Sequence, residues 1–77
     1  MKTAAGDVII CHKPDVSIRL VAVVVNDGED PFDIQRWRPE GRISAEEIAR
    51  ATVSNTGGRV LRWDGHSLEF DRDIDSF

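Results

Sequence analysis

The sequence predicts an α+β fold: a two-layer sandwich, in the order β-β-(β)-α-β-β, with one helix across one face of an antiparallel sheet of four or five strands. Its 77 residues allow a single domain, residues 1–77, with one core. Short stretches rich in β-branched residues lie near both ends of the chain. Between them lies one segment with helical spacing and helix start and stop signals.

The first third of the chain predicts a hairpin. A run of β-branched residues indicates a strand over about residues 7–12, and Lys-Pro-Asp at 13–15 has turn chemistry. A second strand then runs from Val16 to Val25 and becomes wholly apolar from Leu20 onward. Because such a stretch would promote aggregation at an exposed edge, we expect it inside the sheet.

The middle of the chain contains the clearest local signal in the sequence, a helix N-terminus that predicts a helix from Ala45. Ser44 and Glu47 match a capping box, and Ile43 can close a hydrophobic staple on Ile48. The helix ends at the Asn-Thr-Gly-Gly sequence of residues 55–58. Residues 32–38, ahead of it, form an optional third strand.

The last third predicts a second hairpin, Arg59 to Trp63 and His66 to Phe70, joined by the two-residue turn Asp64-Gly65. In this register Trp63 opposes His66. Residues 71–77 form an acidic tail that we expect to fray.

Composition excludes several classes of function. Ten Lys and Arg against 14 Asp and Glu give a net charge of −4, which disfavours general nucleic-acid binding. A single cysteine excludes a disulfide within the chain, and we expect no metal and no cofactor. Cys11 and His12 point to opposite faces of one strand, so they make no catalytic pair. No apolar run is long enough to span a membrane, and we expect a cytoplasmic protein.

Two candidate surfaces stand out. The first would bind a basic partner, and an extended tail would align its acids at intervals of about 6.6 Å, like a phosphate backbone. Its residues are Asp27, Glu29, Asp30 and Asp33 in a loop, and Glu69, Asp71, Asp73 and Asp75 in the tail. The second surface, suited to single-stranded nucleic acid or to a protein hot spot, is Arg36, Trp37, Arg38 and Arg42. The alternatives are a solvating loop and tail, and a Trp37 packed at a sheet end.

We expect a small, acidic, non-catalytic protein-binding module rather than an enzyme. It would be an inhibitor or adaptor that docks on a basic groove of a larger protein or complex, such as one that handles nucleic acid. Phage-encoded inhibitors, anti-CRISPR proteins among them, share this size, acidity and plan, which is an analogy only. The alternative is weak single-stranded nucleic-acid binding through the Arg/Trp patch. A homodimer would also bury the valine-rich strand and the uncovered sheet face.

Overall fold

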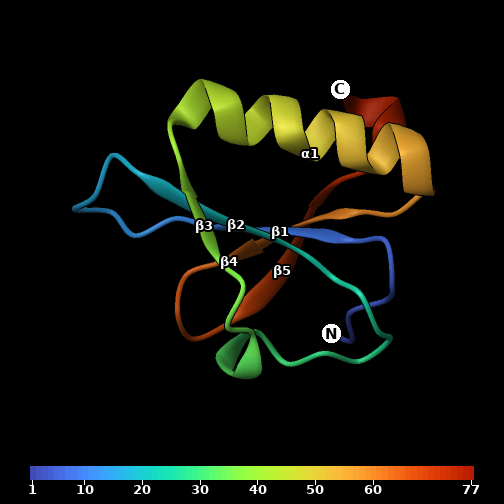
Figure 1. The fold of residues 1–77 in the computed structure, drawn as a ribbon, viewed down its shortest axis with the longest axis horizontal. Coiled ribbons are helices and arrows are strands. Elements are labelled where there is room, and N and C mark those ends of the chain that lie inside the picture. The colour runs from blue at the N-terminus through green and yellow to red at the C-terminus, as the bar shows by residue number, and fades with distance from the viewer.

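The computed structural model describes all 77 residues, and it shows a five-stranded sheet with one long helix across one face (Figure 1). In chain order, the elements are β1 (Val8–Cys11), β2 (Arg19–Val23), η1 (Pro31–Asp33), β3 (Arg38–Glu40), α1 (Arg42–Thr56), β4 (Val60–Trp63), β5 (Leu68–Arg72) and η2 (Ile74–Ser76). Here η marks a short 3-10 helix. The predicted α+β fold, with one helix packed on the sheet, is confirmed.

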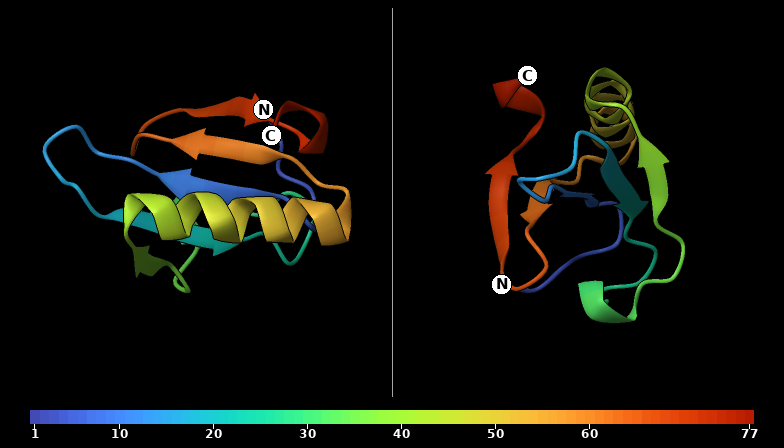
Figure 2. Two further views of the ribbon diagram at one scale, coloured as in Figure 1. Left: turned by 90° about the horizontal axis from the view of Figure 1, so that it is seen from above. Right: turned by 90° about the vertical axis from the view of Figure 1, so that its left-hand side faces the viewer.

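The sheet is mixed rather than antiparallel, which corrects one detail of the prediction. Its strand order is β3-β2-β1-β4-β5, and β1 pairs in parallel with β4 while every other neighbouring pair is antiparallel. The parallel pair arises because α1 carries the chain from β3 across the sheet to β4 (Figure 2). A helical crossover of this kind returns the chain in the same direction.

The central strand β1 is buried on both faces. Val8 and Ile10 pack under α1, whereas Ile9 and Cys11 belong to a second core cluster on the opposite face. β2 lies between β1 and β3 and therefore not at an edge, as predicted. Its regular part is shorter than predicted, because residues 16–18 and 24–25 lie outside it.

The start of α1 differs from the prediction. The helix begins at Arg42, directly after β3, and its N-cap is Gly41, which offers no side-chain hydrogen bond. The capping box at Ser44 is therefore wrong, since this residue already lies inside the first turn. Ile43 is 72% exposed and makes no staple.

The rest of α1 follows the predicted pattern. Ala45, Ala49 and Val53 form its buried stripe against the sheet. The helix ends at Gly57, whose φ of 71° is the left-handed conformation that glycine tolerates best.

The face of the sheet opposite α1, which we expected to be partly uncovered, is covered by the segment between β2 and β3. Ile34, at 6% exposure, and the partly buried Trp37 pack there with Ile9 and Leu61. The third strand predicted over residues 32–38 is wrong except at its last residue, where β3 begins. Asp30 caps η1 by accepting the backbone N–H of Phe32 at 3.0 Å, and this turn chemistry prevails over the apolar alternation.

The connection between β4 and β5 is longer than the predicted two-residue turn. Trp63 pairs with Leu68 rather than with His66, because the Asp64 carboxylate accepts the backbone N–H groups of His66 and Ser67 at 2.8 Å. The observed register differs from the predicted one by two residues, so Leu68 still packs on the core face that contains Leu61 and Trp63.

The C-terminal residues pack beside α1. The β4–β5 pairing shifts register between Val60 and Leu61, and Arg72 then pairs with Val60 and lies 2.6 Å from a carboxylate oxygen of Glu46 on α1. The Arg72 guanidinium also lies 4.6 Å from the centre of the Phe77 ring. Residues 71–77 thus complete β5 and form η2 against α1, which differs from the frayed tail that we expected.

Asp7 connects the N-terminal segment to the start of β4. This residue is 1% exposed, and its carboxylate accepts the backbone N–H groups of Ala4 and Arg59 at 2.9 Å and Nη2 of Arg59 at 2.6 Å. Burial alone would raise the pKa of Asp7, but the hydrogen bonds from Arg59 and Ala4 outweigh it and lower that pKa. The buried charge is tolerated because it is paired and hydrogen-bonded.

Candidate functional site

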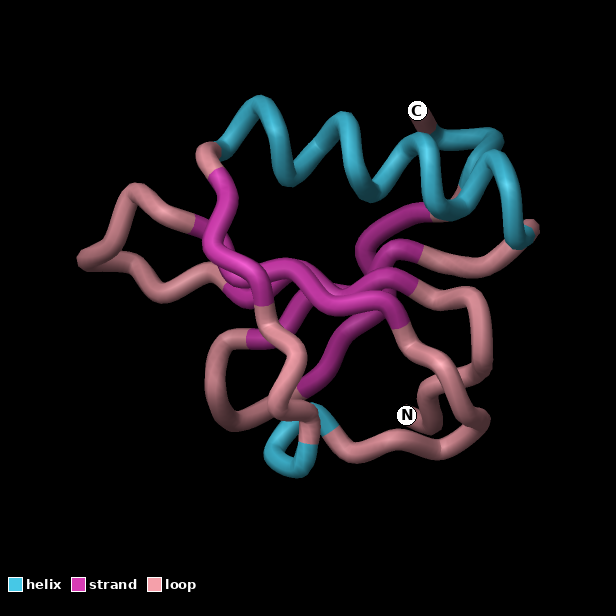
Figure 3. The backbone as a smooth tube through the Cα atoms, viewed as in Figure 1, coloured by secondary structure: helices cyan, strands magenta, loops and turns pink.

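The candidate site is an apolar surface on the face of the sheet opposite α1. The connection between β1 and β2, the η1 turn and the β4–β5 connection supply residues to one cavity there. Figure 3 traces the backbone of these three segments outside the strands. Its most exposed aromatic residue is Phe32, at 70% exposure. The ring of Phe32 stands edge-on to that of Trp63, with centroids 4.9 Å apart and planes at 90°. This is a favourable aromatic geometry, but it leaves most of Phe32 in solvent.

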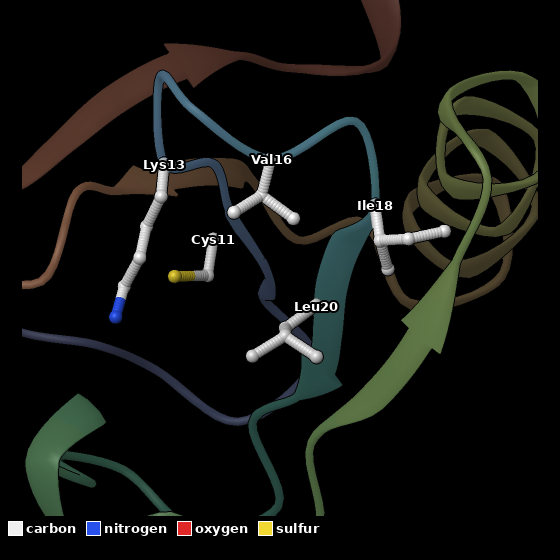
Figure 4. Close-up of a pocket in the computed structure, with 5 residues that line it drawn as sticks. All are labelled: Cys11, Lys13, Val16, Ile18 and Leu20. Atoms are coloured by element: carbon white, nitrogen blue, oxygen red, sulfur yellow. The ribbon is translucent and has the colours of Figure 1, made fainter.

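Three cavities share residues along this surface, which makes it continuous. The first, of about 190 Å³, is bordered by Val16, Ile18, Cys11, Leu20 and the aliphatic part of Lys13 (Figure 4). The second shares Cys11 and Leu20 with it and extends to Phe32, Trp37 and Trp63. The third shares Phe32 and Trp63 and extends to Leu68. We call this the Phe32 surface, defined by Val16, Ile18, Leu20, Phe32, Trp63 and Leu68.

The local sequence explains why Phe32 points outward. Asp30 caps the η1 turn and Pro31 occupies its start, where the fixed φ of proline suits a helical turn. Pro31 and Ile34 are buried on either side of Phe32. A short helical turn whose flanking residues point into the core leaves its middle residue at the surface.

Carboxylates lie in or next to the segments that form the apolar centre. Asp30 borders the third cavity and the exposed Asp33 follows Phe32 directly, while Asp64 follows Trp63. Hydrogen bonds from the backbone of Ser67 and His66 lower the pKa of Asp64, so it is ionised at neutral pH. Lys13 is the one basic residue that lines these cavities. Asp30 and Lys13 thus balance within the linings, and Asp33 and Asp64 add negative charge in the adjoining chain.

Cys11 lines the first two cavities from below. The residue is 6% exposed, and burial raises the pKa of its thiol. A buried thiol with a raised pKa stays protonated at neutral pH and is a poor nucleophile. His12 lines a different cavity, on the α1 side of the sheet, which agrees with the prediction that these neighbours point apart.

The structure gives internal roles to most of the predicted acidic loop residues. Glu29 accepts the backbone N–H groups of Val25 and Asn26 at 2.6 and 3.0 Å and forms an ion pair with Arg36 at 2.6 Å. These contacts, the Arg36 bond foremost, lower the pKa of Glu29 to about 2. Asp27 accepts the backbone N–H of Ala5 at 2.7 Å, and Asp30 caps η1. Asp33 makes no side-chain hydrogen bond or ion pair within the chain.

The four predicted tail acids do not form a one-sided ladder. Glu69 pairs with Arg62 at 2.9 Å, Asp71 lies 3.4 Å from Arg72, and Asp73 caps η2 by accepting the backbone N–H of Asp75. The shifted register and η2 interrupt the extended geometry that the ladder requires. The tail also lies beside α1 while the acidic loop lies across the sheet from it, so the two acidic groups are not brought together (Figure 1).

The predicted Arg/Trp patch is also divided. Arg36 is tied to the Val23 carbonyl and to Glu29, and Trp37 packs against the core cluster opposite α1. Arg38 projects outward from β3, with its nearest carboxylate, that of Glu40, at 3.6 Å. Arg42 is exposed at the start of α1. The four residues therefore form no shared stacking platform.

The residues that sequence reasoning missed are Phe32, Trp63 and the apolar side chains of the β1–β2 connection. One available signal was Asp-Pro ahead of Phe32, which is a cap followed by a helix-initiating proline. The cavities themselves depend on three loops that are distant in the sequence.

Comparison of the chain with protein-family models, with curated proteins and with solved structures finds no match. No group of three or more His, Cys, Asp or Glu side chains is placed to hold a metal ion. The single long helix, α1, lacks the length and apolar character needed to cross a bilayer.

Proposed function

We propose that the protein is a non-catalytic binding module that uses the Phe32 surface to dock on a partner protein, as an inhibitor or an adaptor. The partner would present an apolar side chain surrounded by lysine or arginine. The observation that carries this proposal is the 70% exposure of Phe32 above Trp63, at the centre of a continuous apolar surface.

Energetics support an aromatic contact site. Contiguous apolar surface on a small protein is expensive to leave in water and commonly marks an interaction site. Aromatic residues at the centre of such a surface dominate the binding energy when a partner excludes water around them. Phe32 meets this description because it is held in place by buried neighbours while its ring stays accessible.

The charge around the surface favours a basic partner. The rim of the surface contains Asp30 and the one base Lys13, Asp33 and Asp64 directly follow Phe32 and Trp63 in the chain, and the whole chain has a net charge of −4. Such a rim accelerates association with a basic protein and makes that association sensitive to salt. Three of the four tail acids, Glu69, Asp71 and Asp73, make contacts within the chain, so the tail contributes less to this proposal.

Direct nucleic-acid binding through the Arg/Trp patch has weaker support. Trp37 packs against the core and Arg36 is engaged by Glu29, so two of its four members are already occupied.

The test compares two exposed apolar residues of similar accessibility. Phe32 is 70% exposed in the Phe32 surface, and Ile43 is 72% exposed on α1, away from it. Tagged wild type, Phe32→Ala and Ile43→Ala would be used to capture partners from native cells, and affinities would then be measured with the purified partner. We expect F32A to weaken binding at least about 30-fold, as for a hot-spot residue, and I43A to change it less than about 2-fold.

Asp33→Asn provides a separate test of the charged rim, because Asp33 makes no side-chain contact within the chain. It should slow association and reduce the salt dependence of the rate while leaving stability unchanged. Equal affinity of F32A and wild type for the captured partner would refute the proposed surface.

A further inference from the structure

A second cavity of different chemistry lies on the α1 side of the sheet. It has a volume of about 460 Å³ and is open to solvent between the β1–β2 connection and the first residue of α1. Its lining includes His12, Ser17, Arg19 and Arg42, with Asp15 as its one carboxylate. Two permanent cations and an imidazole thus face one acid, on a chain whose net charge is −4. We call it the Arg42 cavity.

The guanidinium of Arg19 is held in position before any ligand arrives. Its Nη1 donates to the backbone carbonyls of Ser17 at 3.0 Å and Val16 at 3.4 Å. Its Nε and Nη2 donors make no hydrogen bond within the chain. A guanidinium fork fixed at one nitrogen and free at the others suits bidentate binding of an oxyanion.

Arg42 is the second free cation. It makes no side-chain hydrogen bond and no ion pair within the chain. It also stands in the first turn of α1, where the helix dipole opposes positive charge, and neither an acidic residue nor a side-chain cap offsets it. The cavity and its two arginines are the binding features. A bound anion would in addition offset the unfavourable interaction between Arg42 and the helix dipole.

We propose that the Arg42 cavity binds a phosphate group through Arg19 and Arg42, with His12 and Ser17 as further donors. The group could belong to a small phosphorylated compound or to a nucleic-acid backbone, since both present the same tetrahedral oxyanion. The Arg42 cavity lies on the α1 side of the sheet and the Phe32 surface lies on the other side, and Val16 in the β1–β2 connection lines both. The two proposals are therefore tested at residues that they do not share, Arg42 for this one and Phe32 for the other.

The test uses pyrophosphate as the probe and amide chemical shifts as the readout, at low ionic strength. We expect saturable shifts centred on residues 12–19 and 41–43. Arg42→Gln should weaken binding about 10-fold through the loss of one charge-assisted contact. The matched control is Arg50→Gln, which removes the same charge from an exposed position of α1 outside the cavity and should change affinity less than about 2-fold.

A second arm identifies the source of the phosphate. Tighter binding of a single-stranded oligonucleotide, with shifts at the same residues, would assign the site to a nucleic-acid backbone, whereas saturation by pyrophosphate alone would assign it to a small ligand. The proposal is overturned if no saturable shifts appear up to about 10 mM pyrophosphate, a limit weaker than ordinary ligand affinity. It is equally overturned if R50Q weakens binding as much as R42Q does, or if sodium chloride of matched ionic strength produces the same shifts.

Discussion

Replacing Asp7 with asparagine tests the buried ion pair that joins the N-terminal segment to β4. Asp7→Asn keeps the shape of the side chain but removes its charge and turns an acceptor into a donor. Arg59 donates to both carboxylate oxygens, through its backbone N–H at 2.9 Å and Nη2 at 2.6 Å, and one of these bonds must be lost in the variant.

The size of the effect follows from burial. Removing one member of a fully buried ion pair costs about 3–5 kcal/mol. We expect D7N to lose about 3 kcal/mol, the lower end of this range, because the Arg59 side chain is 34% exposed. A domain of 77 residues has a total stability of about 4–12 kcal/mol. With a urea dependence of about 1 kcal/mol per molar, the midpoint of unfolding should fall by about 3 M.

Urea unfolding followed by tryptophan fluorescence measures this change. Asp15→Asn is the control, because Asp15 is exposed and makes no hydrogen bond, and it should shift stability by less than about 0.5 kcal/mol. An equally small effect of D7N would refute the assigned role of the pair.

The ion pair also sets a dependence on pH. The folded-state pKa of Asp7 is lowered from 3.8, so its carboxylate stabilises the fold above about pH 4, and this contribution is lost as the pH falls through the folded value. The difference in stability between wild type and D7N should therefore persist from pH 7 to about pH 4 and shrink below it.

Three further predictions test other parts of the structure. A Cβ at Gly58 would lie 2.3 Å from the Gly6 carbonyl oxygen, so Gly58→Ala should cost about 1–3 kcal/mol in thermal melts. Gly41→Ala meets nothing within 4 Å and should lose only the preference of the N-cap for glycine, at most about 1 kcal/mol; equal melting temperatures of Gly58→Ala and wild type would contradict this packing. Burial raises the pKa of the Cys11 thiol, so iodoacetamide should alkylate it at least about 10-fold more slowly in the native protein than in urea at the same pH, and similar rates by mass spectrometry would argue against a buried thiol. The Glu29 carboxylate, whose pKa falls from 4.5 to about 2, should protect the amides of Val25 and Asn26 from hydrogen exchange until the pH approaches 2, where the folded-state carboxylate takes up a proton; Glu29→Gln should expose both, and unchanged exchange would remove its assigned role.

Local chemistry predicted much of the fold. β-Branched residues identified β1 and β2, and the glycine at residue 57 identified the end of α1. The errors arose where two local signals competed. Ser44 can cap a helix, but β3 ends at Glu40 and the chain enters α1 before it reaches Ser44. Pairing of β1 with β4 is a contact between distant segments, so no local pattern could specify its direction.

The candidate site was less predictable than the fold. Counting acids identified Asp30, which lines the Phe32 surface, and Asp33, which follows Phe32 in the chain, but it could not reveal that Glu29 is engaged by Arg36. The exposure of Phe32 depends on the η1 turn and on its contact with Trp63, which is distant in the sequence. The surface forms only when the three loops come together in the folded chain.

The most direct test of the binding surface is the indole N–H resonance of Trp63 during titration with the purified partner. Trp63 is 7% exposed beneath Phe32, so a partner that covers Phe32 must change its surroundings. We predict that this resonance and the amides of residues 30–34 shift together and saturate at the measured affinity. Saturable shifts confined to the outer side of α1, around Glu47 and Arg50, with an unchanged Trp63 signal, would contradict the account.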